Sequence, residues 1–248
     1  MSRAWSIRSP MLTPTALASE VRRKSGTVWR AVEHQHTVST RKIVDTRDEQ
    51  ELLEEILEES KPHYPVEAES LHYLLKTPFR HYPPYPHGSR FRRVRSREGV
   101  YYASEHIRTS LAEFVHYRVR FFAASPQTPL PRTDSLVTVF AVKYASTHCL
   151  DLTLPPLVKD RARWVHPTDY SVTQEFADLA RAAKVNVLRY ESVRDLEGGF
   201  NLALLNPTAF ATKAPTEQQV WILYFAPSET NCTRTGLMGT EERWTFTR

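Results

Sequence analysis

The sequence predicts an α+β fold, a single domain in which helices flank a mixed β-sheet core. Two segments, 45–60 and 172–183, carry apolar residues at helical spacing, whereas most runs of the second half are short and β-branched. The order of these segments is irregular and no internal repeat is visible, which argues against a regular parallel α/β array. With 248 residues, of which 41% are hydrophobic, the chain is long enough to bury one sizeable core.

We expect residues 1–26 to form a flexible basic extension and residues 27–248 to form the domain itself. Up to Arg30 the chain carries several arginines and one lysine against a single acid, Glu20. A transit peptide has the same basic composition, so this alternative stays open. A short helix over 15–24 is the one element expected within the extension.

In the first half of the domain, the clearest expected element is a helix over 45–60. Leu52, Leu53 and Ile56 form one apolar stripe, acidic residues fill the other faces, and a lysine–proline pair ends the helix. The proline-rich and aromatic segment 63–88 is expected to pack as an irregular cover. The other expected elements are one or two short strands within 27–44, a short helix near 67–76, a buried strand over 100–103 and a helix over 107–122.

In the second half, strands predominate. A β-branched run predicts a strand over 136–143, and two glycines at 198–199 mark a turn before another strand over 200–205. A helix is expected over 172–183, because Phe176 and Leu179 recur on one face. The remaining expected strands span 147–152, 185–190, 220–225 and 242–247.

Cysteine usage and charge narrow the class of protein. Cys149 and Cys232 belong to no CxxC or Cys/His cluster, so we expect reduced thiols and no metal site. No apolar run approaches the ~18 residues of a membrane span and no secretory segment is present, so a cytoplasmic protein without membrane contact is expected. A net charge of +5 favours an anionic ligand, but the absence of nucleic-acid-binding motifs predicts no direct contact with nucleic acid.

Three local strings carry the most specific signal: GSRFRR at 88–93, VYYASEHIRTSLAEFVHYR at 100–118 and LRYESVRD at 188–195. Together with neighbouring strings over roughly residues 27–210, they resemble the RES-domain family. The known members of that family are NAD-consuming toxins of bacterial toxin–antitoxin pairs, on a fold like that of the ADP-ribosyltransferases. The resemblance implies a helix-turn-helix antitoxin that blocks the site, and a homodimer.

The residue types in these strings suit cleavage of the bond between nicotinamide and ribose. Nicotinamide leaves as a neutral base, and the transition state resembles an oxocarbenium ion that a carboxylate stabilises. An arginine fork binds a diphosphate, and an aromatic face holds a flat ring. A hydroxyl can hydrogen-bond the carboxamide of nicotinamide or the ribose. Because one arginine, tyrosine, glutamate and serine meet these needs, the expected chemistry requires no metal.

The resemblance assigns the roles residue by residue. Arg90 would bind the diphosphate of NAD, and Tyr102 would stack on nicotinamide. Glu113 would contact the nicotinamide ribose and stabilise the cation. Ser192 would contact the nicotinamide side. Arg194 is a further candidate, for contact with a phosphate, because it flanks the strand end at Ser192 and not because of the resemblance. These five residues form the predicted catalytic and NAD-binding site.

Each assignment has a plainer alternative. The interval between Arg90 and Tyr102 is two residues longer than in compact members of the family. Arg92 or Arg93 could therefore take the role of Arg90, and Tyr101 could take that of Tyr102. An arginine in a basic run is usually a solvated charge, and a tyrosine in a strand usually belongs to the core. Glu113 differs, because a carboxylate beside the apolar side of its helix is either paired or functional.

Three functions remain open from the sequence. The first is an NAD glycohydrolase or phosphorylase acting as a toxin. The second is a protein ADP-ribosyltransferase that uses the same site. The third is a catalytically inactive binding protein. Asn201 flanks the same strand end as Ser192, and we interpret His116 as structural.

Overall fold

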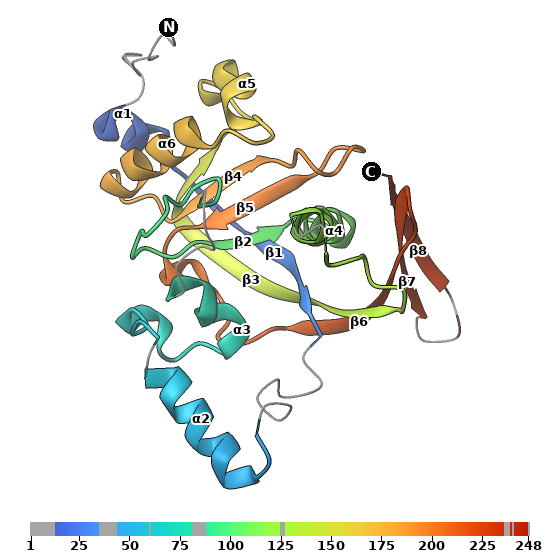
Figure 1. Ribbon diagram of the computed structural model, residues 1–248. Coiled ribbons are helices and arrows are strands. Elements are labelled where there is room, and N and C mark those ends of the chain that lie inside the picture. Colours follow the sequence, from blue (N-terminus) through green and yellow to red (C-terminus); the bar gives the residue numbers. More distant parts are fainter. Residues whose placement is uncertain are drawn as a thin grey trace, which may run out of the picture.

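A mixed β-sheet organises the molecule (Figure 1). The computed structural model describes residues 13–34, 44–59, 61–80, 88–124, 127–235, 239 and 241–247. Its strands are β1 (Arg22–Glu33), β2 (Tyr101–Ser104), β3 (Ser135–Asp151), β4 (Val187–Glu191), β5 (Phe200–Leu204), β6 (Glu217–Phe225), β7 (Glu229–Thr235) and β8 (Glu241–Thr247). Its helices are α1 (Pro14–Glu20), α2 (Arg47–Glu59), α3 (Tyr73–Lys76), α4 (Ile107–Ala123), α5 (Arg161–Trp164) and α6 (Ser171–Ala182), with 3₁₀ turns η2 (Val66–Ala68), η3 (Thr77–Phe79), η4 (Leu157–Asp160) and η5 (Pro207–Ala209).

The strands lie in the order β1-β2-β5-β4-β3-β6-β7-β8. Strand β1 pairs with β3 as well as with β2, so β1, β2, β5, β4 and β3 close into a ring. Strands β6, β7 and β8 extend from β3 as an arm. Of these pairings only β3 with β4 is parallel, and helices cover the sheet in no regular alternation. The predicted α+β class, with one mixed sheet flanked by helices, is confirmed.

Strand β3 joins the ring to the arm. Its first part pairs with β6, its last residues pair with β4, and its other edge pairs with β1 over almost its whole length. The prediction of two separate strands, 136–143 and 147–152, is wrong. The polar residues between them stay in one strand because the backbone remains paired to β1, for example at Lys24 and Ser146.

Helix α4 lies in the angle between the ring and the arm (Figure 1). Leu111, Ala112 and Val115 are buried there and belong to one cluster with Val139 and Trp221 of the neighbouring strands. Close packing on this scale fixes the helix in position. The polar side chains of α4 that border this apolar stripe are therefore held at defined places against the sheet.

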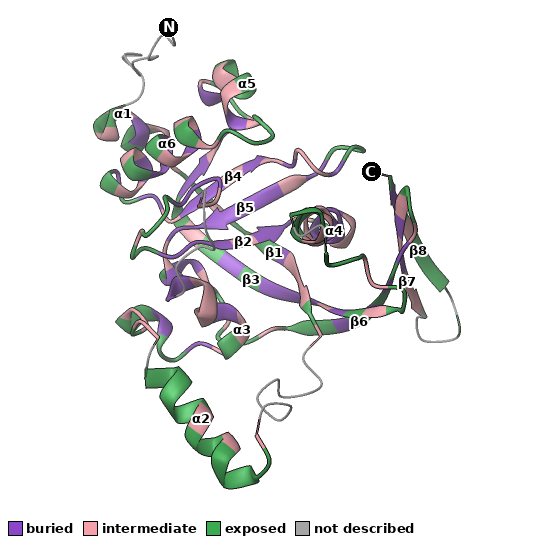
Figure 2. Ribbon diagram, in the orientation of Figure 1, coloured by how far each residue is buried: buried purple, intermediate pink, exposed green. Residues whose placement is uncertain are grey.

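Two further clusters complete the core. Helices α1 and α6 cover one part of the ring, with Leu17 and Phe176 buried in that cluster. The segment from η2 to η3 covers another part with Leu75 and Phe79. Helix α2 stands apart, and no described residue of it is buried (Figure 2). No helix of the described segments is long and apolar enough to span a membrane.

One further expectation from the sequence needs correction, and one strand was not expected. Of the extension expected over 1–26, residues 1–12 lie outside the described residues, whereas 13–26 contain α1 and the start of β1 and are folded. The reason is tertiary: Leu17 is fully buried against α6, and β1 pairs with β3 from Arg22 onward. The unexpected strand is β7, which the sequence did not predict because its residues are mostly polar and its pairing with β6 and β8 defines it.

Candidate active site

Glu113, on α4, is held by two neutral side chains. The hydroxyl of Ser192 donates a hydrogen bond of 2.7 Å to Glu113 Oε1, and the amide of Asn201 donates one of 2.6 Å to the same oxygen. Glu113 is half-buried, and within the described residues no group donates to its other oxygen, Oε2. The carboxylate is therefore fixed through one oxygen and keeps the second for a ligand.

The two donors to this carboxylate are themselves fixed by their neighbours. Ser192 follows β4, and its hydroxyl oxygen accepts the backbone N–H groups of Arg194 and Asp195, both at 3.2 Å. Asn201 lies in the adjacent strand β5, and its Oδ1 accepts a hydrogen bond of 2.6 Å from Ser104 of β2. The Ser192 hydroxyl has one proton to donate, and its oxygen already accepts two backbone N–H groups, so its O–H is directed towards the carboxylate of Glu113. The Oδ1 of Asn201 is held by Ser104, which directs the amide N–H of Asn201 towards the same carboxylate.

Arg90 provides a buried positive charge that pairs with no carboxylate of the described residues. Its side chain donates a hydrogen bond of 2.6 Å to the carbonyl of Trp164, and only 8% of the residue is exposed. Its guanidinium carbon lies 4.8 Å from the ring centre of Tyr170 and 6.0 Å from that of Tyr190. Among the described residues no acid pairs with Arg90. A buried guanidinium without an acidic partner is costly, so this position favours an anionic ligand.

A second cation approaches the same tyrosine. Arg194 Nη2 donates a hydrogen bond of 3.3 Å to the hydroxyl of Tyr170 and another to the carbonyl of Pro167. Arg90 and Arg194 thus contact the same side chain, Arg90 at the ring of Tyr170 and Arg194 at its hydroxyl. No ion pair to a described acid neutralises Arg194 either, so both charges are available to a ligand such as a diphosphate.

Tyr102, in β2, supports the segment that carries Arg90. Its hydroxyl is hydrogen-bonded to the hydroxyl of Ser89 at 2.9 Å and accepts the backbone N–H of Phe91 at 2.9 Å. Burial raises the pKa of Tyr102, so the phenol is neutral. Tyr102 therefore fixes the residues on both sides of Arg90, a role that the sequence did not suggest. The stacking of Tyr102 on nicotinamide stays a prediction.

Two further side chains respond to the charges of this site. Burial, together with the nearby negative charge of Glu113, raises the pKa of Tyr190 well above its ordinary value. Burial, together with the positive charge of Arg194, lowers the pKa of His116 to about 4. Tyr190 is therefore a neutral phenol and His116 a neutral imidazole at physiological pH.

The alternative assignments at neighbouring positions fit the geometry less well. Tyr101 is fully buried in a different cluster, where its ring lies 4.9 Å from that of Phe210. Arg93 is half-exposed and paired with Asp178 at 2.7 Å. Arg92 is buried and donates to the carbonyl of a residue in its own turn. Neither Tyr101 nor Arg93 lies with Glu113.

The five residues expected to form the site lie in one connected network. Sequence reasoning missed Tyr170 and Tyr190, and it noted Asn201 only as a neighbour of Ser192. Tyr190 lies two residues before Ser192, so alternation along the strand could have placed both on one face. Tyr170 lies in an irregular turn and carried no sequence signal.

Comparison with known proteins identifies the family. A family model described as the RES domain matches residues 64–225. The chain belongs to the RES domain family. The resemblance inferred from the local strings is thereby confirmed, and the matched range contains all five expected site residues.

This RES domain is similar to a chain of the crystal structure of the M. tuberculosis MbcT–MbcA toxin–antitoxin complex, with a TM-score of 0.49 and 10% sequence identity. The similarity covers 85% of this chain and 91% of the other. No curated protein matches the sequence.

Proposed function

We propose that this protein cleaves NAD at the bond between nicotinamide and ribose, as the toxin of a toxin–antitoxin pair. The observation that carries the proposal is Glu113, fixed through Oε1 and open at Oε2, in a site whose buried Arg90 has no acidic partner among the described residues. Membership of the RES domain family supports the same activity.

The residues divide the work between binding and charge stabilisation. Arg90, which lies over the ring of Tyr170, and Arg194, which donates to its hydroxyl, together bind the diphosphate. Glu113 Oε2 lies against the ribose and stabilises the positive charge that develops as the bond to nicotinamide breaks. The electron pair of that bond leaves with nicotinamide, and water then forms the new bond to the ribose carbon and releases its proton to solvent.

Ser192 has a different role in this proposal from the one that the family resemblance implied. The hydroxyl of Ser192 donates its hydrogen bond to Glu113, so Ser192 orients the carboxylate rather than contacting nicotinamide. Asn201 shares that role through its bond to the same oxygen. Tyr102 positions Arg90 through the backbone of the residues beside it.

The acceptor of the ADP-ribose group distinguishes the candidate reactions. Water makes the protein a glycohydrolase, phosphate makes it a phosphorylase, and a side chain of another protein makes it an ADP-ribosyltransferase. Glu113 is half-buried, and a small acceptor reaches a half-buried site more readily than a side chain of another protein does, which favours water or phosphate. We further propose that the protein is located in the cytoplasm, forms a homodimer and is blocked by a helix-turn-helix antitoxin. These three points rest on the family alone.

One assay separates the alternatives. The purified protein is incubated with NAD in buffer with and without phosphate, and with a cell extract, while free nicotinamide, ADP-ribose and labelled proteins are measured. Free nicotinamide without labelled protein is the expected result. Labelled protein would identify a transferase, and no consumption of NAD under any condition would leave only the inactive binding protein.

Expression in a bacterium tests the toxin part of the proposal. Growth is expected to stop as cellular NAD falls, and Glu113→Gln is expected to relieve both effects together. A basic protein could instead be toxic by coating nucleic acid or membranes. Equal toxicity of the Glu113→Gln protein, or growth arrest at unchanged NAD, would support that explanation and contradict the proposal.

A further inference from the structure

A cavity of about 650 Å³ lies away from the site built around Glu113. The cavity and the site lie at opposite ends of strands β4 and β5. The cavity is lined by Asn186, which precedes β4, and by Leu205, which follows β5. In the site, Ser192 follows β4 and Asn201 lies at the start of β5. Strands of five residues separate the two regions, which is roughly 15 Å at the usual rise per residue. The cavity is therefore a separate candidate site.

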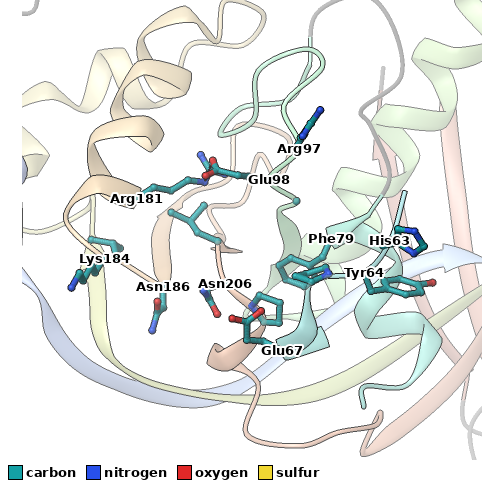
Figure 3. A pocket seen from close by; sticks show the side chains of 15 residues that line it. His63, Tyr64, Glu67, Phe79, Arg97, Glu98, Arg181, Lys184, Asn186 and Asn206 are labelled. Carbon is teal, nitrogen blue, oxygen red and sulfur yellow. Dashed lines mark ion pairs between the residues drawn. The ribbon is translucent and has the colours of Figure 1, made fainter. Parts of the chain in front are cut away.

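The lining of the cavity has two chemically different parts (Figure 3). Arg97, Arg181 and Lys184 supply positive charges on one side. On the other side lie the aromatic rings of Tyr64 and Phe79, together with the imidazole of His63 and the carboxylate of Glu67. A volume of this size and a mixed lining are typical of sites for small molecules.

The described residues neutralise the positive side only in part, because Glu98, which also lines the cavity, pairs with Arg181 but not with Arg97 or Lys184. Among the described residues, no ion pair involves Arg97 or Lys184. Arg181 Nε lies 2.9 Å from Glu98 Oε2, but the geometry does not make a hydrogen bond, and this buried N–H has no acceptor in the described part of the chain. A buried donor without an acceptor is costly, and an anionic oxygen in the cavity would satisfy it.

Close backbone packing fixes the wall of the cavity. A Cβ atom at Gly99 would lie 2.1 Å from Phe79 Cα and 2.4 Å from the carbonyl oxygen of Pro78, so the two segments can approach only because residue 99 is glycine. Lys184 has a positive φ of 57° at the end of α6, which turns the chain into β4. The cavity is therefore formed by the fold rather than by flexible side chains alone.

We propose that this cavity binds a phosphorylated small molecule with an aromatic or apolar body, of the class of nucleoside monophosphates. The phosphate would lie among Arg97, Arg181 and Lys184, where arginine forks suit its oxygens. The flat body would lie towards Phe79 and Tyr64. The size of the cavity, the charge on one side and the aromatic rings on the other are the observations that select this class.

The cavity is connected to the catalytic segment through one side chain. Arg181 Nη2 donates a hydrogen bond of 3.3 Å to the carbonyl of Phe91, the residue after Arg90. A phosphate that draws Arg181 into the cavity would weaken this support and alter the position of Arg90. This coupling rests on the NAD-cleaving function proposed above, whereas the binding itself does not.

Calorimetric titration with AMP tests the binding. We expect Lys184→Ala and Arg97→Ala each to weaken AMP about tenfold or more, because a hydrogen bond to a charged group typically contributes that much. Lys159→Ala and Arg132→Ala, which remove exposed cations elsewhere, are the matched controls and should change nothing. Adenosine and inorganic phosphate, each lacking half of the ligand, should bind more weakly than AMP.

The possible contrary results are distinct. Loss of AMP binding in Arg90→Ala with full binding in Lys184→Ala would assign the ligand to the catalytic site and overturn the proposal. Equal affinity for phosphate and AMP would overturn the ligand class, and no AMP binding to the unmodified protein would overturn the site. The coupling is tested separately: AMP should change the rate of NAD cleavage in the unmodified protein but not in Lys184→Ala, and an equal effect in both would refute it.

Discussion

Replacing Glu113 by glutamine removes one negative charge while it preserves the shape of the side chain. The amide oxygen can still accept the hydrogen bonds of Ser192 and Asn201, which both reach one oxygen of the carboxylate. The amide nitrogen then takes the place of the oxygen that faces the ligand. The fold and the binding of NAD should therefore survive, and only the charge opposite the developing cation is lost.

The magnitude follows from the electrostatics of a half-buried site. Two unit charges about 4 Å apart interact by about 4 kcal/mol at an effective dielectric constant of about 20. Lost in full, this amounts to about a thousandfold in rate, and removal of a single stabilising contact typically costs about 10²–10³. We expect kcat of Glu113→Gln to fall within that range, with little change in the affinity for NAD.

The assay is release of nicotinamide under saturating NAD, combined with direct titration of NAD and a thermal unfolding curve for each protein. Glu175→Gln, on the exposed face of α6, is the matched control and should retain full turnover. Turnover of Glu113→Gln equal to that of the unmodified protein would refute the proposed role of this carboxylate. A fall in turnover matched by loss of folding would instead show that Glu113 is structural.

Four further predictions follow from the same geometry. Arg90→Ala should weaken NAD binding at least tenfold, whereas Arg93→Ala, which removes an exposed cation, should leave it unchanged; the reverse order in a titration would move the diphosphate contact along the chain. Asn201→Ala should lower kcat about tenfold with a smaller effect on NAD affinity, because the carboxylate loses one of its two fixed donors; an unchanged kcat would contradict this positioning role. Turnover should persist in EDTA, since the sequence offers no Cys/His ligand set, and restoration by a divalent ion after loss in EDTA would count against it. Folding lowers the pKa of His116 from 6.5 to about 4, so between these pH values the unfolded chain binds more protons than the folded one. The free energy of unfolding should therefore fall as the pH drops through this window, by at most about 3 kcal/mol from this group. A His116→Asn protein with the same pH dependence of stability would show that other groups cause it.

Much of the local structure could be predicted from the sequence. The apolar stripe of α4 at Leu111 and Val115 defines the helix and its buried side, and Glu113 beside that stripe is marked as a carboxylate that needs a partner or a function. Such patterns work because a helix or strand repeats with a fixed period, so a few neighbouring residues determine which face is buried. The strings around Arg90, Tyr102 and Ser192 carried enough identity to name the family.

Only the tertiary structure decided which distant residues complete the site. The contact of Arg90 with Tyr170 and the bond from Asn201 to Glu113 join segments about 80 or more residues apart. The length of β3 and the folding of the segment around Leu17 were decided in the same way, by pairing and packing with partners far along the chain. The physical reason is that sequence periodicity determines local faces, whereas strand register and ring closure determine which faces meet.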